Sequence, residues 1–274
     1  MLRKLMRFER VLLAVALCLP LLAACASTKD DDYVERPAEE IYNSGIKKFN
    51  ERNYTSAAKE FDEVDRQHPY SEWALRAQLM GAYSYYQGLN YKEALKALEN
   101  FIQENPGYKD VGYAYYLRAL CYYEQIVDIT RDQQTTNFAL EALRDVTTRF
   151  PDTEYAHDAQ LKIDLALGQL AGHEMDIGRY YERHGIYQAA INRYQVVVKN
   201  YQTTGQAPEA LHRMVECYLA LGLTDEAKRA AAVLGYNYPN NPWYRKAYAL
   251  LVKDGAAPAG DEDGWLHRQV KAVF

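Results

Sequence analysis

The feature that most constrains this chain is a pattern of small, aromatic and proline residues that recurs five times. Each occurrence pairs a first segment, holding a small residue and usually a tyrosine, with a second segment holding an alanine and a large apolar residue. The alanines of the second segments are Ala57, Ala94, Ala139, Ala190 and Ala227. Small residues let two helices approach closely, and a proline ends a helix. The pattern therefore predicts helix pairs stacked in series.

This is the tetratricopeptide pattern, whose unit is about 34 residues. Gly45 and Phe61 occupy a small and a large position of the first repeat, and Gly178 and Tyr194 occupy the same two positions of the fourth. The fourth repeat has Gln202 where proline is expected. The alternative is a generic helical bundle with tyrosines in its core, but that fold would not require these positions to recur.

We therefore expect an all-α tetratricopeptide-repeat solenoid of about five repeats with a C-terminal capping helix. Repeats 1–3 occupy 38–151, and 152–254 holds a long helix, repeats 4–5 and the capping helix at 241–254. The long helix is predicted over about 153–184, because no proline follows Pro151 there. We expect 255–274 to be a flexible tail, since its first half is rich in Gly, Ala and Asp.

The first 24 residues have the composition of an export signal, with a basic start followed by the uncharged run Val11 to Ala24. That run is shorter than the roughly 20 apolar residues of a membrane-spanning helix. It ends in Leu-Ala-Ala before Cys25, which is similar to the bacterial lipobox. This interpretation predicts removal of 1–24, a diacylglycerol and an acyl chain on Cys25, and a tether over 25–37. The alternative is an ordinary signal-peptidase site with an incidental cysteine.

Composition argues against several classes of function. The formal net charge is −5 and no basic patch is visible, so we expect no nucleic-acid partner. Cys121 and Cys217 lie alone in apolar helical runs and are predicted to be buried thiols. The histidines are scattered, and neither a nucleophile elbow nor a phosphate loop is present. We therefore expect no metal, no cofactor apart from the lipid on Cys25, and no enzymatic activity.

Tyrosine is unusually frequent, with 25 residues against 7 phenylalanines. In repeats 1–3 the first-helix positions expected to face the concave surface are mostly aromatic, and they form the predicted substrate groove. They are Tyr42, Ile46, Phe49, Arg76, Leu79, Tyr83, Tyr86, Tyr113, Tyr116 and Tyr123. The same positions in repeats 4 and 5 are mostly charged, namely Met175, Arg179, Glu182, Glu209, His212 and Glu216. We predict an N-terminal groove for apolar or aromatic extended segments and a C-terminal half for a folded partner. The alternative for each tyrosine is packing between helices alone.

Four longer strings make a resemblance specific. They are HPYSEWALRAQLMGAYSYY (68–86), RFPDTEYAHDAQ (149–160), GRYYERHGIYQAAINRY (178–194) and APEALHRMVECYLALGL (207–223). With the lipobox and the repeats, they resemble the BamD (ComL) family over about 37–250. These lipoproteins belong to the outer-membrane β-barrel assembly machinery.

The resemblance implies a lipid-anchored adaptor on the periplasmic face of the outer membrane. It would bind a BamA-like barrel subunit, other lipoproteins of the complex and unfolded outer-membrane proteins. It also implies that the N-terminal repeats recognise substrate signals ending in an aromatic residue. Arg193 matches the family's arginine in the fourth repeat, and we assign Arg193, Arg179 and Glu182 to the BamA-binding half. The alternative function is a tetratricopeptide lipoprotein that scaffolds peptidoglycan enzymes.

Overall fold

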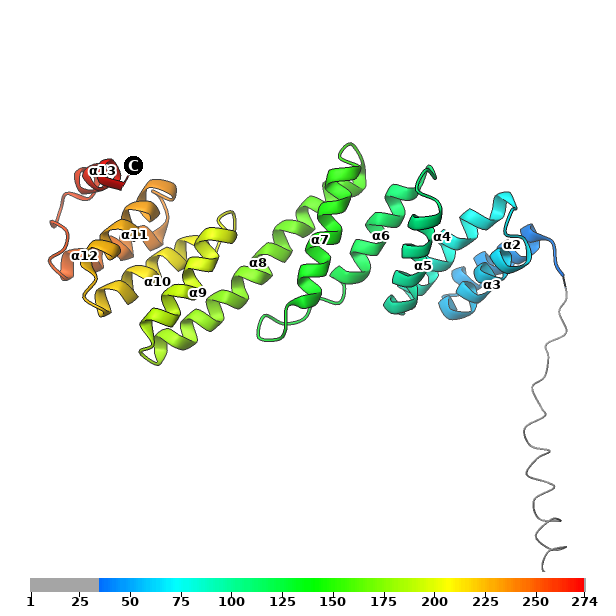
Figure 1. Cartoon of the computed structure of the whole chain (residues 1–274), viewed down its shortest axis with the longest axis horizontal. Helices are drawn as coiled ribbons and strands as arrows, with labels where there is room; N and C mark the ends of the chain where they lie inside the picture. Colours follow the sequence, from blue (N-terminus) through cyan, green and yellow to red (C-terminus); the bar gives the residue numbers. More distant parts are fainter. Residues whose placement is uncertain (1–34, 274) are drawn as a thin grey trace, which may run out of the picture.

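The computed structural model describes residues 35–273, and these form a row of antiparallel α-helices without a β-strand (Figure 1). The predicted signal peptide, Cys25 and most of the 25–37 tether lie outside the described residues. The helices are α2 (Ala38–Asn50), α3 (Tyr54–Gln67), α4 (Glu72–Gln87), α5 (Tyr91–Glu104), α6 (Val111–Tyr123), α7 (Gln134–Arg149), α8 (Glu154–Arg183), α9 (Tyr187–Asn200), α10 (Ala207–Ala220), α11 (Thr224–Asn237), α12 (Pro242–Lys253) and α13 (Glu262–Val273).

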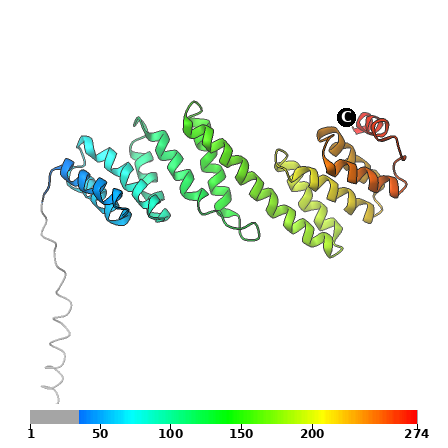
Figure 2. The same cartoon turned by 180° about the vertical axis from the view of Figure 1, so that it is seen from behind.

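Consecutive helices pack on one another along the row, and both views show the same order from α2 to α12 (Figures 1 and 2). The helix pairs are those that the repeats predict, so the expected tetratricopeptide solenoid is confirmed. None of the helices in the described part of the chain is both long and apolar enough to cross a membrane.

The small-to-large contacts expected from the repeats hold the helix pairs together. A Cβ atom on Gly45 would lie 2.7 Å from Cε1 of Phe61, and one on Gly178 would lie within 3.0 Å of the Tyr194 ring. Real Cβ atoms do not approach that closely, because interiors are already close-packed. Phe61 and Tyr194 are both fully buried. Glycine is therefore required at these two positions for the paired helix to reach its place.

Helix α8, the single helix of 30 residues, joins the two halves of the solenoid at the predicted place. Thr153 begins it by accepting a hydrogen bond from the backbone N–H of Ala156, at 3.2 Å. Its first half buries Ala159 and Ile163 against repeat 3, whereas its second half buries Met175 against α9. One rigid helix thus belongs to both halves.

The insertion between α6 and α7 docks on α8, which the sequence did not predict. Ile129 packs against Gly172, where an added Cβ would lie 3.4 Å from the Ile129 side chain. The carbonyl of Ile129 accepts a hydrogen bond from Nδ1 of His173. Nε2 of Gln169 donates to the carbonyl of Val127 at 2.6 Å. These contacts brace repeat 3 against the middle of α8.

The expectation of a flexible tail over 255–274 is corrected by α13. Trp265 is 3% exposed, and its ring packs edge-on against Tyr248 with ring centroids 5.4 Å apart. Leu266 lies close to Gly235 of α11. Burying an indole contributes about 2–3 kcal/mol, which offsets the entropy of ordering the Gly- and Asp-rich connection before it. Helix α13 therefore covers the end of the solenoid beside α11 and α12 (Figure 1).

Two glycines of α8 provide a matched test of the helix-packing contacts. We expect Gly178→Ala to lower the free energy of unfolding by about 2 kcal/mol, because the new methyl overlaps the buried Tyr194 ring. Gly168→Ala should instead raise it by up to about 1 kcal/mol, because a Cβ there meets no atom within 4 Å and alanine favours a helix. Urea denaturation followed by circular dichroism measures both. Equal effects of the two substitutions would contradict the packing described here.

Candidate binding surfaces

A continuous set of aromatic rings crosses the first three repeats and reaches α8. Phe49 stacks on Tyr83 with ring centroids 5.4 Å apart, and Tyr83 lies edge-on to Tyr113 at 6.4 Å. Tyr113 lies 5.7 Å from Tyr155, the first-turn tyrosine of α8. Such pairs contribute about 0.5–1.5 kcal/mol each beyond their buried area. We call this set, with Tyr42, Tyr86 and Tyr116, the aromatic face.

The rings of the aromatic face are half-buried, so each one packs between helices and also retains solvent-exposed surface. Some hydroxyls bond within the chain: Tyr116 donates to Asp158 at 2.5 Å, and Tyr83 accepts from Gln87 at 2.9 Å. The hydroxyls of Tyr42, Tyr86 and Tyr113 form no hydrogen bond with any other described residue.

The pKa values of these free hydroxyls keep them protonated. Burial, followed by the charge of Glu124, raises the pKa of Tyr86 to about 12. Burial likewise raises the pKa of Tyr113. A neutral phenol both donates and accepts hydrogen bonds. The aromatic face therefore offers apolar rings, which can contact apolar side chains, together with free hydroxyls, which can bond to the backbone of an extended peptide.

The remaining predicted groove residues lie at the edges of this face. Ile46 packs against the buried core of the first repeat, and Arg76 is exposed. The Lys162 ammonium lies 5.4 Å from the centroid of the Tyr123 ring. Sequence reasoning missed Trp73 and Tyr155, which both join the rings. Trp73 could have been found, because it lies three residues before Arg76 and so shares its side of α4.

The predicted charged positions of the C-terminal half bond mainly to one another. Arg179 binds Glu209 through two parallel contacts, Nε to Oε1 at 3.1 Å and Nη2 to Oε2 at 2.9 Å. Arg213 reaches Glu209 at 3.4 Å and Glu216 at 3.1 Å. Burial raises the pKa of Glu209, but Arg179 and Arg213 outweigh it and the net pKa is lowered. This network ties α8 to α10.

Glu182 belongs to the same network. It accepts the hydroxyl of Tyr194 at 2.6 Å and lies 3.8 Å from Arg213. Its carboxylate and the Arg179 guanidinium are thus already engaged within the chain. The two side chains hold repeat 4 against repeat 5, and a partner at this surface would meet a charge network that is largely neutralised.

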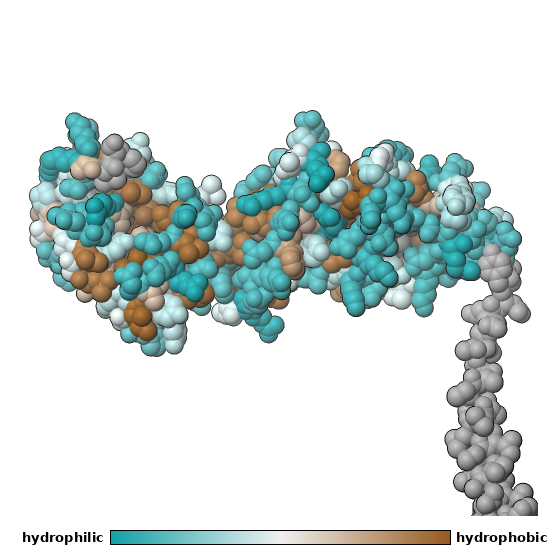
Figure 3. All heavy atoms as spheres, in the orientation of Figure 1, coloured by the Kyte–Doolittle hydropathy of each residue, from teal (hydrophilic) through white to brown (hydrophobic). Residues whose placement is uncertain are grey.

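Arg193 lies apart from this network, on α9. Its Nη1 is 3.1 Å from Glu174 of α8, and its side chain remains 42% exposed. The connections between α8 and α9 and between α10 and α11 also expose apolar side chains, namely Ile186, Leu221 and Leu223. Figure 3 shows apolar surface between the polar side chains of the C-terminal repeats. Arg193 therefore keeps donors available to a partner.

Two buried titratable groups of the C-terminal half, His212 and Cys217, are uncharged at pH 7. Burial, and then Arg213 and Lys246, lower the pKa of His212 to about 4, so the ring is neutral at pH 7 as it packs 5.0 Å from Trp243. Burial raises the pKa of the Cys217 thiol to about 12. In the part of the chain that the structure describes, no group of three metal-ligating side chains occurs.

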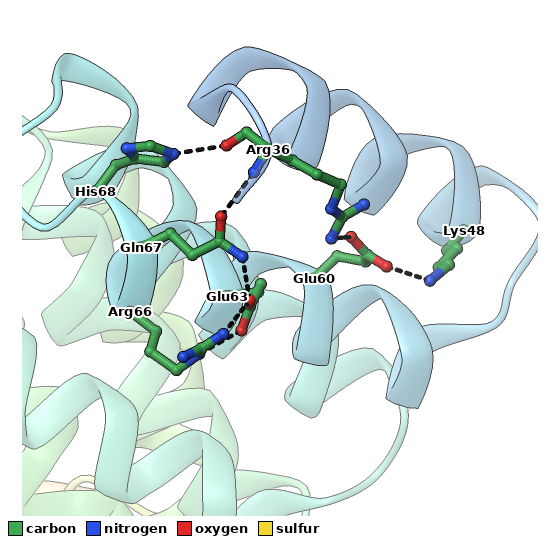
Figure 4. A network of polar contacts seen from close by, with 7 residues as sticks. All are labelled: Arg36, Lys48, Glu60, Glu63, Arg66, Gln67 and His68. Carbon is green, nitrogen blue, oxygen red and sulfur yellow. Dashed lines mark hydrogen bonds and ion pairs between the residues drawn. The ribbon is translucent and has the colours of Figure 1, made fainter. Parts of the chain in front are cut away.

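The N-terminal end of the solenoid holds a polar latch where the tether enters α2 (Figure 4). The backbone N–H of Arg36 donates to Gln67 at 2.9 Å, and its carbonyl accepts Nε2 of His68 at 2.6 Å. Its guanidinium binds Glu60 at 2.9 Å, and Lys48 binds the same carboxylate. Burial raises the pKa of Glu60, but these two cations lower it overall. The latch fixes the direction in which the chain leaves the solenoid toward residue 35.

Comparison with known proteins is consistent along most of the chain. Residues 34–234 match the YfiO family, described as outer membrane lipoproteins. The chain is 49% identical to a Caulobacter vibrioides protein named outer membrane protein assembly factor BamD, over 91% of this chain and 83% of that protein. It is 45% identical to the Rickettsia prowazekii protein of the same name, over 90% and 98%.

A more distant relative with that name, from Neisseria meningitidis serogroup A, is 32% identical over 88% of this chain and 95% of its own length. The names of these relatives do not favour the alternative of a scaffold for peptidoglycan enzymes. They agree with the resemblance drawn from the four sequence strings.

Proposed function

Since the chain belongs to the YfiO family of outer membrane lipoproteins, we propose that it is an adaptor of the outer-membrane β-barrel assembly complex. It acts on the periplasmic face of the outer membrane, by binding rather than by catalysis. It binds the BamA-like barrel subunit and receives unfolded outer-membrane proteins. The observation that carries the substrate role is the aromatic face with its free tyrosine hydroxyls.

The chemistry of unfolded barrel strands suits this face. Such strands alternate apolar and polar side chains, and their backbone N–H and C=O groups are unpaired until the barrel forms. The rings of Phe49, Tyr83 and Tyr113 take the apolar side chains, and the free hydroxyls bond to the backbone groups. Contacts between aromatic rings and apolar side chains depend little on the exact sequence of the ligand. Many different substrates can therefore use one surface.

The lipid anchor is Cys25, and the latch at Arg36 connects it to the solenoid. Two or more acyl chains anchor a protein stably, whereas one does so only reversibly. Because Arg36 is hydrogen-bonded to Glu60, Gln67 and His68, the tether is connected to α3 as well as to α2. The first repeat, with the start of the aromatic face, is therefore the part of the solenoid held nearest the membrane.

The C-terminal half binds the barrel subunit, and Arg193 is its principal charged contact. Arg179 and Glu182 are engaged within the chain, so their role is to shape this half rather than to supply free charges. An arginine can form two parallel hydrogen bonds with a carboxylate. Arg193 uses only Nη1 toward Glu174, which leaves the rest of its guanidinium for a carboxylate of the partner.

The anchor is tested by metabolic labelling with an alkyne-bearing palmitate. We expect label on the wild-type protein and none on Cys25→Ala, which should move from the outer-membrane fraction to the soluble periplasm. Cys18→Ala, within the predicted signal peptide, is the matched control and should keep the label. Retention of label by Cys25→Ala would exclude this anchor.

The substrate role is tested with a peptide of alternating Val and Thr that ends in Phe. Tyr83→Ala should weaken its binding about tenfold, because the substitution removes the ring that contacts three others on the face. Tyr236→Ala, an exposed tyrosine on α11, should bind as the wild type does. Fluorescence anisotropy measures affinity, and circular dichroism checks that both variants are folded. Equal affinities for all three proteins would exclude the aromatic face as the substrate surface.

The barrel-subunit role is tested by co-purification from detergent-extracted membranes. Arg193→Glu should reduce recovery of the BamA-like subunit about tenfold or more, because it replaces attraction to a partner carboxylate by repulsion. Glu174→Gln removes the intramolecular pair but leaves Arg193 in place, so it should not reduce recovery. A loss of equal size in both variants would show that only the internal pair matters.

A further inference from the structure

A cavity outside the aromatic face opens where α5, α6 and α7 meet, three consecutive helices of the row (Figure 1). Its volume is about 200 Å³, and its lining includes Glu99 of α5, Arg118 and Tyr122 of α6, and Phe138, Glu141 and Asp145 of α7. Tyr122 comes about two and a half helical turns after Tyr113, so it leaves α6 on the side opposite to the aromatic face. The cavity is therefore separate from the predicted substrate groove.

Two aromatic rings form an apolar wall of this cavity. The centroids of the Tyr122 and Phe138 rings lie 5.7 Å apart, and Phe138 is 45% exposed. An apolar side chain stabilises the fold only through the area that it buries. The exposed part of the Phe138 ring is therefore available to a ligand, and the face of an aromatic ring attracts cations.

The charges around the rings also favour a cation. The lining holds three carboxylates and a single guanidinium, that of Arg118, which is paired with Asp145 at 2.8 Å. Glu99 and Glu141 are exposed, and neither forms an ion pair with any described residue. Burial, followed by the charge of Glu99, raises the pKa of Tyr122, because a negative charge nearby opposes ionisation of the phenol.

A similar set of groups, two turns earlier on α6, is filled by the chain itself. The guanidinium carbons of Arg118 and Arg149 lie 4.9 Å and 5.4 Å from the centroid of the Tyr115 ring. Both guanidinium groups also contact Asp145, at 2.8 Å and 3.9 Å. Tyr122 has carboxylates beside it, but no cation of the described residues lies over its ring. The position of the guanidinium is thus left open at Tyr122.

We propose that the cavity binds an arginine side chain of a partner protein, with the guanidinium packed on the rings of Tyr122 and Phe138. Its N–H groups donate to the carboxylates of Glu99 and Glu141. The planar guanidinium stacks on a ring and bonds to carboxylates at the same time, which a lysine ammonium does not do. The volume is below the roughly 300–1,000 Å³ of pockets for whole small molecules, so it suits one side chain. This docking site goes beyond the proposed function, and it leaves the aromatic face free for substrate.

The test uses the full lipidated protein in deuterated detergent and three capped pentapeptides of sequence Gly-Ser-Xaa-Ser-Gly. The central residue is arginine, lysine or citrulline, the uncharged analogue of arginine with almost the same shape. Saturation-transfer-difference NMR titrations measure the three affinities. We expect the arginine peptide to bind about tenfold more tightly than the citrulline peptide and more tightly than the lysine peptide.

Variants assign this preference to the cavity. Glu99→Gln combined with Glu141→Gln should remove the advantage of arginine over citrulline, and Phe138→Ala should reduce it about threefold. These three side chains are exposed, so circular dichroism should show all variants folded. Glu93→Gln, at an exposed glutamate of α5 outside the cavity lining, is the matched control and should keep the full preference.

A second measurement asks whether the arginine belongs to a protein. Lys96, exposed one turn before Glu99 on α5, is replaced by the photo-crosslinker p-benzoyl-phenylalanine in cells. Mass spectrometry should map the crosslink to a partner segment that contains arginine, and the crosslink should be lost when that arginine is replaced by glutamine. Loss is also expected in the Glu99→Gln and Glu141→Gln double variant.

Three results would overturn the proposal. The first is equal affinity of the wild type for the arginine and citrulline peptides, or failure to bind either. The second is equal affinity for arginine and lysine, which would reduce the site to general attraction of positive charge. The third is a crosslink that is absent, or that persists in the double variant. None of these results bears on the aromatic face, because the Tyr83→Ala experiment tests that surface with a different ligand.

Discussion

The close contact between a small residue on one helix and a ring on its partner is the interaction on which the solenoid depends. At Gly45 and Gly178 the ring of the paired helix occupies the space that a Cβ would need. That contact brings the two helices of each pair close enough to bury large side chains completely, as at Phe61 and Tyr194. Because each pair has the same geometry, stacking the pairs places the first helices side by side. The contact between a glycine and a ring thus leads to a surface that is shared by the first helices of several repeats, although these helices are not consecutive in the sequence.

The two halves use that geometry with different chemistry. In repeats 1–3 the first helices carry tyrosines whose rings pack on one another and whose hydroxyls remain partly free, so packing uses one end of the side chain and leaves the other available to a ligand. In repeats 4 and 5 the corresponding positions form ion pairs, and the Arg179–Glu209 pair is closed within the chain. A partly buried pair of this kind fixes how two repeats sit together. The first half is thus suited to changing, extended ligands, and the second to one partner of fixed shape.

The sequence was sufficient for features that repeat and insufficient for those that occur once. The small and large positions recur, so the helix pairs and the long helix could be predicted, and Glu154–Arg183 lies within the expected 153–184. The docking of Ile129 on Gly172 occurs once and joins residues distant in sequence, so no period indicates it. The Gly- and Asp-rich start of the tail predicts flexibility, yet burial of Trp265, with Leu266 beside Gly235, holds the tail in place. At the candidate surfaces the residue types could be predicted, but the partners could not: Arg179 pairs with Glu209, and Glu182 accepts from Tyr194. These partners lie on other helices, and no repeat position indicates them.

The lengths and contacts of the solenoid determine how its two surfaces relate to the membrane. The latch at Arg36 bonds the chain that precedes α2 to the first repeat, so the aromatic face begins at the end of the solenoid from which the proposed lipid tether extends. Helix α8 has 30 residues and, at 1.5 Å per residue, spans about 45 Å between repeat 3 and repeat 4. The carbonyls of Val127 and Ile129 bond to Gln169 and His173 in the middle of α8. These contacts oppose bending of α8 between the two halves. The proposed substrate segment on the aromatic face and the proposed partner at Arg193 would be held at the separation that α8 sets. An adaptor needs that property to deliver a substrate to another protein instead of merely retaining it.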